Sequence, residues 1–174
     1  SARAMDHLRA IAGSPRPIGS AGAAAAAASL RRHLERLGLA PYVQTAEVVS
    51  PITPRVAGVV HNVVGRLPGA DPSRAVLLMT HYDSVPTSVG AADDGSGVAA
   101  LLETARALCS GPRPRNDVIF LFTDGEEQGL LGARAFLRDD PSAYAVGVVV
   151  DFDSPGSSSP ALMYETSPAN GLLV

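Results

Sequence analysis

Runs of hydrophobic residues with two different periods divide the chain into short helices and strands. Residues 3–12 carry apolar side chains near helical spacing, and residues 13–19 hold two prolines and two glycines, so we expect a helix followed by a loop. Ser20 can cap a second helix, whose alanine run has high helix propensity and whose apolar stripe is Leu30, Leu34 and Leu37. Gly38 suits the position just after this helix. The chain is therefore predicted to open with a helical pair.

Farther along, β-branched and continuous apolar runs alternate with helical ones. We expect strands at residues 42–49, 56–67, 75–79, 118–122 and 146–150, and helices near residues 98–108 and 130–137. The last three strands are uninterrupted apolar runs, as expected for strands buried on both faces. Alternating strands and helices are typical of a parallel sheet with helical crossovers. We predict one domain with an α/β fold of three αβα layers, a mostly parallel mixed sheet and an N-terminal helical pair.

Composition narrows the possible functions. The 174 residues are 46% hydrophobic and 18% charged, which is typical of a globular domain. All fourteen basic residues are arginine, which excludes P-loop and Schiff-base chemistry that needs lysine. The net charge of −3 without a basic cluster predicts no nucleic-acid binding, and the lack of a long apolar run predicts no membrane contact from this segment. The single cysteine, Cys109, excludes an internal disulfide, and we expect it to be a small buried hydrophobe.

Polar side chains follow the buried strands at the points where these strands end. Because ligands bind outside the carboxyl ends of the strands in an open α/β sheet, we expect these side chains to converge at one rim. The groups concerned are His81 and Asp83 after the strand at 75–79, Asp93 and Asp94 before the next helix, Glu126 and Glu127 after the strand at 118–122, and Asp151 and Asp153 after the strand at 146–150.

One imidazole and several carboxylates at one rim suggest a metal centre. Crowded carboxylates repel one another unless a cation lies among them, and this ligand set suits zinc and other divalent ions. His81 and Asp83 are two residues apart and point the same way in extended backbone, so one can bind metal while the other orients it. Of the adjacent Glu126 and Glu127, one can be a ligand and the other a general base.

Three motifs in this order resemble metallopeptidase family 28, the co-catalytic zinc aminopeptidases: HYD at 81–83, GAADDGSG at 90–97 and DGEEQGLLG at 124–132. Residues 151–156, residues 163–167 and the loop at 14–20 resemble the endoplasmic-reticulum metallopeptidase (Fxna-like) branch and its bacterial relatives. The resemblance covers nearly the whole chain. It implies a zinc-exopeptidase fold, a peptide substrate and a membrane-anchored parent whose peptidase domain lies outside the cytosol.

The same resemblance implies a role for each residue at the rim. The metal ligands would be His81 and Asp153 for one zinc, Glu127 for a second zinc, and Asp93 for both. Glu126 would be the general base that takes a proton from a water bridging the two ions, and Asp83 would fix His81. The implied reaction is hydrolysis of the peptide bond next to a free N-terminus.

The chain departs from the family pattern at one ligand. The family has a further histidine ligand downstream of the Asp153 position, whereas the histidines here are His7, His33, His61 and His81. We therefore expect residues 1–174 to be the N-terminal part of one zinc peptidase domain, truncated at the C-terminus, with an incomplete second zinc site and little activity alone. The alternatives are a peptidase-like binding domain without metal, and a glutaminyl cyclase, although the Glu126–Glu127 pair favours hydrolysis.

Each rim residue also has an ordinary structural interpretation. His81 taken alone could be a satisfied core histidine. Glu126 and Glu127 could be a solvated pair at a helix N-terminus. Asp151 and Asp153 both follow the same strand, and only the family pattern chooses Asp153 as the ligand.

The remaining polar residues are expected to have structural roles. Asp93 is expected to cap the helix that follows it as well as to bind metal, because the two roles are compatible. Asp94 and Asp124 are expected to be turn or cap residues, and the other three histidines to lie at the surface or in packing contacts. Tyr164 could line a substrate pocket or belong to the core.

Overall fold

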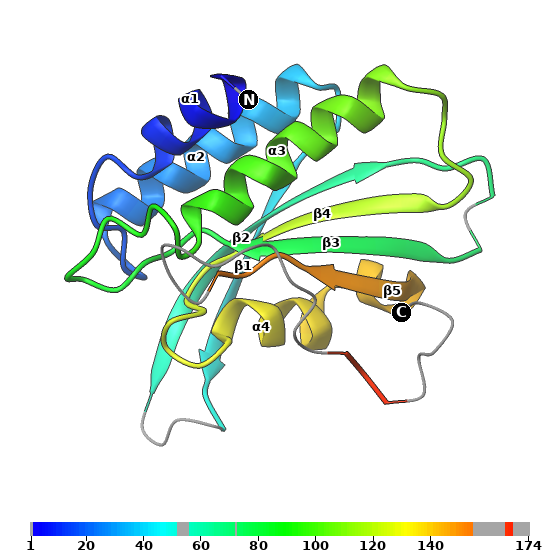
Figure 1. Cartoon of the computed structure of the whole chain (residues 1–174). Helices are drawn as coiled ribbons and strands as arrows, with labels where there is room; N and C mark the ends of the chain where they lie inside the picture. Colours follow the sequence, from blue (N-terminus) through cyan, green and yellow to red (C-terminus); the bar gives the residue numbers. More distant parts are fainter. Residues whose placement is uncertain (1, 52–55, 72, 155–165, 169–174) are drawn as a thin grey trace.

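The structure is a computed structural model and describes residues 2–51, 56–71, 73–154 and 166–168 (Figure 1). The described strands form one sheet in the order β1-β2-β4-β3-β5. Their bounds are Tyr42–Val49 for β1, Ala57–Leu67 for β2, Ala75–His81 for β3, Asp117–Thr123 for β4 and Val146–Asp151 for β5. β2 runs antiparallel to both β1 and β4, whereas β3 runs parallel to both β4 and β5. The five predicted strands and the mixed sheet are confirmed. The parallel pairs join β3 to β4 and to β5, the three strands that the polar residues follow in the sequence.

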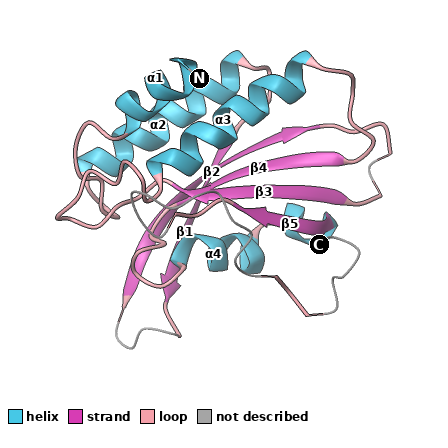
Figure 2. Cartoon of the chain, in the orientation of Figure 1, coloured by secondary structure: helices cyan, strands magenta, loops and turns pink. Residues whose placement is uncertain are grey.

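Helices cover both faces of the sheet, which confirms the three-layer fold (Figure 2). α1 (Ala2–Ile11), α2 (Ala21–Arg36) and α3 (Gly95–Ser110) lie over one face, and α4 (Leu131–Asp139) lies over the other. In the expected N-terminal pair, α2 packs on β2, while α1 packs mainly on α3. A short 3-10 helix, Pro141–Ala145, precedes β5.

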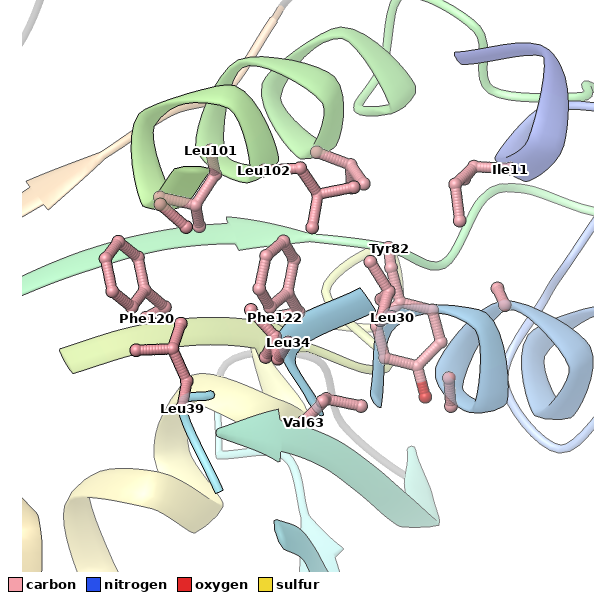
Figure 3. Close-up of a cluster of buried hydrophobic side chains, with 14 of the residues drawn as sticks. Ile11, Leu30, Leu34, Leu39, Val63, Tyr82, Leu101, Leu102, Phe120 and Phe122 are labelled. Atoms are coloured by element: carbon pink, nitrogen blue, oxygen red, sulfur yellow. The ribbon is translucent and has the colours of Figure 1, made fainter. Parts of the chain in front are cut away.

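The main core lies between the sheet and the three helices on one face (Figure 3). Phe120 and Phe122 of β4 are fully buried there in a cluster with side chains of α2 and α3. On the other face of the same strand, Ile119 and Leu121 form a cluster with Phe136 of α4. β4 is thus buried on both faces, as its uninterrupted apolar sequence predicts.

Small side chains allow α2 to approach the core closely. Ala23, Ala26 and Ala27 of the alanine run are buried. Ser20 caps the helix as predicted, because its Oγ accepts a hydrogen bond from the N–H of Ala23 at 3.1 Å. Gly38 ends the helix with a φ of +76°, a conformation that glycine adopts without steric cost.

β5 differs from the strand that its sequence predicts. Val149 and Val150 are 51% and 41% exposed, so the prediction that this strand is buried on both faces is wrong. In the described part of the chain β5 lies at the edge of the sheet and pairs with β3 alone. A run of valines predicts that a strand forms, but it does not set how many neighbours cover that strand.

Two features of composition have a place in this fold. Cys109 lies near the end of α3 and packs, partly buried, against the main core, in line with the small hydrophobe expected there. Among the described helices, none combines the length and the apolar character that crossing a bilayer needs.

Candidate metal centre

The parallel strands bring the predicted polar residues to one edge of the sheet. β3 ends at His81, and its neighbours β4 and β5 end at Thr123 and Asp151. Because the three strands run in the same direction, the loops that follow them begin at the same edge. Asp93 reaches this edge from the turn that precedes α3, where its carboxylate contacts His81.

His81 lies at the centre of the site. Its side chain is only 3% exposed, and its Nε2 lies 2.9 Å from Oδ1 of Asp93, 3.7 Å from Oδ1 of Asp153 and 4.0 Å from Oε2 of Glu126. One ligand atom from each of His81, Asp93 and Asp153 lies within 4.8 Å of the other two. The structure thus brings together three of the four predicted metal ligands and places the predicted general base beside them.

The group includes Asp153 and not its neighbour Asp151 among the residues that the structure describes. Asp151 is the last residue of β5 and pairs with Met79 of β3, one step back from the rim. It lines a small pocket beside the group, together with Leu130 and Ala133. The geometry therefore favours Asp153 as the ligand, a choice that the residue types alone left open.

Asp83 connects the imidazole to the loop that carries the two glutamates. Its side chain is fully buried, and its Oδ1 lies 3.4 Å from Nδ1 of His81. The same oxygen accepts a hydrogen bond from the N–H of Glu126 at 3.0 Å, and Oδ2 accepts one from the N–H of Glu127 at 3.3 Å. Asp83 therefore lies where a residue that orients His81 should lie, and it also fixes the backbone of the predicted base.

Glu127 lies at the rim but outside the group of three ligands. Its Oε1 accepts a hydrogen bond from the backbone N–H of Val85 at 3.1 Å. This contact holds the carboxylate over the loop that follows β3. The role of Glu127 as a ligand of a second zinc stays a prediction.

The cap of α3 is Asp94, so the expectation that Asp93 caps this helix is wrong. Asp94 accepts a hydrogen bond from the N–H of Gly97 at 2.9 Å and another from the hydroxyl of Thr80. Asp94 is fully buried, whereas the side chain of Asp93 is 46% exposed. The two neighbours thus divide the roles, because only one of two adjacent side chains can turn back onto the first turn of the helix.

Crowding changes the pKa values of the central groups. Burial alone lowers the pKa of His81, but the nearby carboxylates of Asp153 and Asp83 outweigh it and raise this pKa to about 11. Burial raises the pKa of Glu126 to about 7, and the negative charges of Asp153 and Asp83 add to the effect. A cation among these groups would act in the opposite sense and favour neutral imidazole and ionised carboxylates.

The donor set fits a zinc ion. One imidazole nitrogen faces carboxylate oxygens of Asp93 and Asp153, and nitrogen with carboxylate oxygen is a ligand combination that zinc accepts. His81 Nδ1 is buried without a well-formed hydrogen bond and faces Asp83, so Nε2 is the nitrogen turned toward the acidic oxygens.

Several other predicted residues lie outside the centre. His7 pairs with Glu103 of α3 at 3.3 Å, and its ring contacts that of His33, so both have packing roles. Asp124 lies in the bend directly after β4, where it is buried, and its carboxylate accepts a hydrogen bond from the N–H of His61 and does not cap α4. Tyr164 lies outside the described residues.

Sequence reasoning missed Arg16, which is 1% exposed and lies next to the loop that links His81 to Asp93. Arginine is expected at the surface, and the hydrogen-bond partners of Arg16 are backbone carbonyls far away in the sequence. The one available signal was its place between two prolines in the loop that resembles the family.

Solved structures of similar proteins share the fold. A Zn-dependent exopeptidase from Parabacteroides distasonis is 25% identical, with a TM-score of 0.73 over 90% of this chain and 61% of that chain. A glutaminyl cyclase from Porphyromonas gingivalis is 27% identical, with a TM-score of 0.76 over 88% of this chain and 58% of that chain. The fold of this chain is the α/β fold of the zinc-dependent exopeptidases.

The chain belongs to peptidase family M28, whose family model matches residues 62–174. A vacuolar membrane protease of Yarrowia lipolytica is 39% identical over 111 residues, which make up 62% of this chain and 11% of that protein. Endoplasmic reticulum metallopeptidase 1 of Rattus norvegicus is 35% identical over 115 residues, 65% of this chain and 13% of that protein. The family expected from the motifs is confirmed, and the chain matches only about an eighth of the length of these relatives.

Proposed function

We propose that this chain is part of a zinc-dependent exopeptidase of the aminopeptidase type, which hydrolyses the peptide bond next to a free N-terminus. The observation that carries the proposal is the convergence of His81, Asp93 and Asp153 at the carboxyl edge of the sheet, with Glu126 beside them. Membership of a peptidase family and the similarity to a Zn-dependent exopeptidase support the same reaction.

In this proposal the rim residues divide the work as the family pattern implies. His81 and Asp153 would hold one zinc, Glu127 would hold a second, and Asp93 would offer its carboxylate to both. When bound, zinc would supply a Lewis acid that polarises the scissile carbonyl and eases the ionisation of water. Asp83 keeps the imidazole and the glutamate loop in register with each other.

Glu126 is the proposed general base. Its side chain is 30% exposed, so a substrate and a water molecule can reach it. As a carboxylate, the form that a nearby cation favours, it can take a proton from the attacking water and then return one to the leaving amine. The backbone N–H of this residue is held by Asp83, which limits the positions that the carboxylate can take.

We further propose that residues 1–174 form the N-terminal part of a single catalytic domain in a longer, membrane-anchored parent. The chain spans 58% and 61% of the two similar solved chains and 11% of the vacuolar membrane protease. A histidine downstream of Asp153 would complete the second zinc site. The name of the vacuolar membrane protease supports a membrane-anchored parent, and we propose that its peptidase domain lies on the extracytoplasmic side of that membrane.

Cyclisation of N-terminal glutamine is a second candidate function, favoured by the similarity to a glutaminyl cyclase. The two reactions give different products from one peptide with glutamine at its N-terminus. Hydrolysis releases free glutamine, whereas cyclisation releases ammonia and leaves a pyroglutamyl peptide of full length. Mass spectrometry of the products therefore decides between them.

Zinc content and activity measured together test the main proposal. Elemental analysis and hydrolysis of aminoacyl p-nitroanilides are compared between this chain and the full-length protein. We expect zinc in both and robust turnover in the longer protein only. A full-length protein that folds but neither binds zinc nor releases N-terminal residues would instead support a peptidase-like binding domain.

A further inference from the structure

Arg16 is a buried arginine in the loop between α1 and α2, where that loop meets the one that precedes α3 (Figure 1). Only 1% of its surface is exposed. A guanidinium group is rarely removed from water to this extent unless it is fully paired. Its partners therefore indicate what its burial achieves.

The guanidinium donates to three backbone carbonyls of one loop. Nε donates to the carbonyl oxygen of Tyr82, Nη1 to that of Val89, and Nη2 to that of Gly90, the last at 2.8 Å. These carbonyls lie at the two ends of the segment 82–90. The planar fork of arginine can hold three acceptors in fixed directions, which a single ammonium group cannot do.

The backbone of Arg16 holds the same segment at a third point. Its N–H donates to Oγ of Ser84 at 3.0 Å, and its carbonyl accepts a hydrogen bond from the N–H of Ser84 at 3.4 Å. Ser84 Oγ in turn donates toward the carbonyls of Val85 and Ser88 at 3.1 and 3.0 Å. The loop is thus held by its polar backbone groups along most of its length.

The space around the guanidinium is closely filled. Gly90 has a φ of +52°, and a Cβ added there would lie 2.7 Å from Cβ of Ser84 and 3.1 Å from Nη2 of Arg16. The loop therefore has little freedom to move toward Arg16. A shift in the other direction would break the hydrogen bonds to Nη1 and Nη2.

This loop separates the first two residues of the metal-ligand group. It begins one residue after His81 and ends three residues before Asp93, and both of these residues lie in the group. The carboxylates whose charges attract the guanidinium all belong to the rim: Asp83, Asp94, Asp93 and Glu127. Arg16 is thus bonded to the loop and surrounded by the acids of the site.

We propose that Arg16 is a positioning residue of the metal centre, which holds the segment 82–90 so that the carboxylate of Asp93 stays opposite the imidazole of His81. This inference rests on the proposed zinc-dependent function. Arg16 would raise zinc affinity by holding the loop in place. Its positive charge alone would lower zinc affinity. A cation near a zinc ion repels it, so a role through charge alone would make zinc bind more tightly once the charge is removed.

The test measures zinc affinity in the full-length protein, with zinc alone in competition with a chelator at 10 °C. Arg16→Lys keeps the charge and loses the fork, and Arg16→Met loses both. We expect both variants to bind zinc about 10–100-fold more weakly, the range seen when supporting partners of a metal site are lost. Lysine should not restore affinity, since one nitrogen cannot reach three carbonyls.

Arg66 provides the matched control for loss of stability. It donates to Asp117, which begins β4 at the end of the strand opposite the metal centre. Arg66→Lys and Arg66→Met should therefore lower the melting temperature and leave zinc affinity within twofold of the original protein. If Arg16→Met does not fold, Arg16→Lys and Ser84→Ala take its place, with a weaker loss expected for Ser84→Ala.

Two results would overturn the inference, and they differ in what else they overturn. Zinc affinity that is unchanged or tighter in the folded Arg16 variants removes the positioning role and leaves the proposed function standing. An original protein that binds no zinc removes both. Weaker binding in the Arg16 variants together with unchanged binding in the Arg66 variants supports the inference.

Discussion

Asp83 Oδ1 accepts a hydrogen bond from the backbone N–H of Glu126 at 3.0 Å and lies 3.4 Å from Nδ1 of His81. One buried carboxylate therefore contacts both the imidazole that would bind zinc and the loop that carries the proposed base. Because Asp83 contacts both the imidazole and the loop of the proposed base, it is the first target for mutation.

Asp83→Asn should weaken zinc binding about 10–100-fold, because a partner that orients the ligand is replaced. The amide keeps one acceptor oxygen, but its NH2 group must face the backbone N–H of Glu126 or that of Glu127, each of which is itself a donor. Chelator competition measures the effect. Asp71→Asn is the control. Asp71 forms an ion pair with Arg115 outside the metal centre, so this variant should bind zinc as the original protein does.

Glu126→Gln should lower turnover in the full-length protein by at least about 100-fold, the lower end of what a general base contributes, while zinc content is unchanged. Glu127→Gln should instead lower zinc content. The two variants are compared by elemental analysis and by a p-nitroanilide assay. Loss of zinc from Glu126→Gln with full occupancy in Glu127→Gln would mean that the two roles are reversed.

Gly132→Ala should destabilise the fold, although alanine favours helices. An added Cβ would lie 2.4 Å from the carbonyl oxygen of Asp124 and 2.5 Å from Oδ1 of Asn62, and backbone there has little room to move. We expect the free energy of unfolding to fall by about 1–3 kcal/mol, as in other overpacked sites. Gly111→Ala is the control, because its Cβ would meet nothing closer than 3.5 Å. Equal urea midpoints for the two variants would show that α4 can shift.

The contribution of His33 to the stability of the fold should fall as the pH is lowered from 6.5 towards 4. Burial, with the charges of His7 and Arg36, lowers the pKa of His33 from 6.5 to about 4. The unfolded chain therefore takes up this proton at a higher pH than the folded chain, so stability present above pH 6.5 is lost as the pH falls. Relative to the original protein, His33→Gln should therefore gain stability in thermal melts as the pH falls across this range. A slope identical to that of the original protein would exclude His33 as the cause.

The sequence predicted secondary structure and the grouping of polar side chains well wherever neighbouring residues determine the local structure. The apolar run of β4 predicts a strand buried on both faces, and this prediction is correct because helices cover both faces of the sheet there. Val149 in β5 has the same kind of neighbours in sequence, but its exposure depends on which strands lie beside it. The sequence does not show which of Asp93 and Asp94 caps α3 and which faces His81, because tertiary contacts set the backbone conformation of these two residues.

Residues whose partners are distant in sequence were harder to predict. Arg16 contacts a loop that starts 66 residues later, and no local pattern records that proximity. Asp124 was expected to be a turn or cap residue, yet the partner of its carboxylate is the N–H of His61 in β2. In both cases the burial of a charged side chain depends on a contact between distant segments, which a single sequence does not display.

His81 and Asp153 stand on either side of α3, β4 and α4 in the chain, and the pairing of β3 with β5 makes them neighbours. The unfolded polypeptide therefore offers zinc no equivalent site, so ligand binding shifts the folding equilibrium by mass action. Scarcity of the ion would first raise the population of open forms at the β5 edge, because the apolar clusters on both faces of β4 do not depend on it. Metal supply would then set how long the folded domain resists proteolysis.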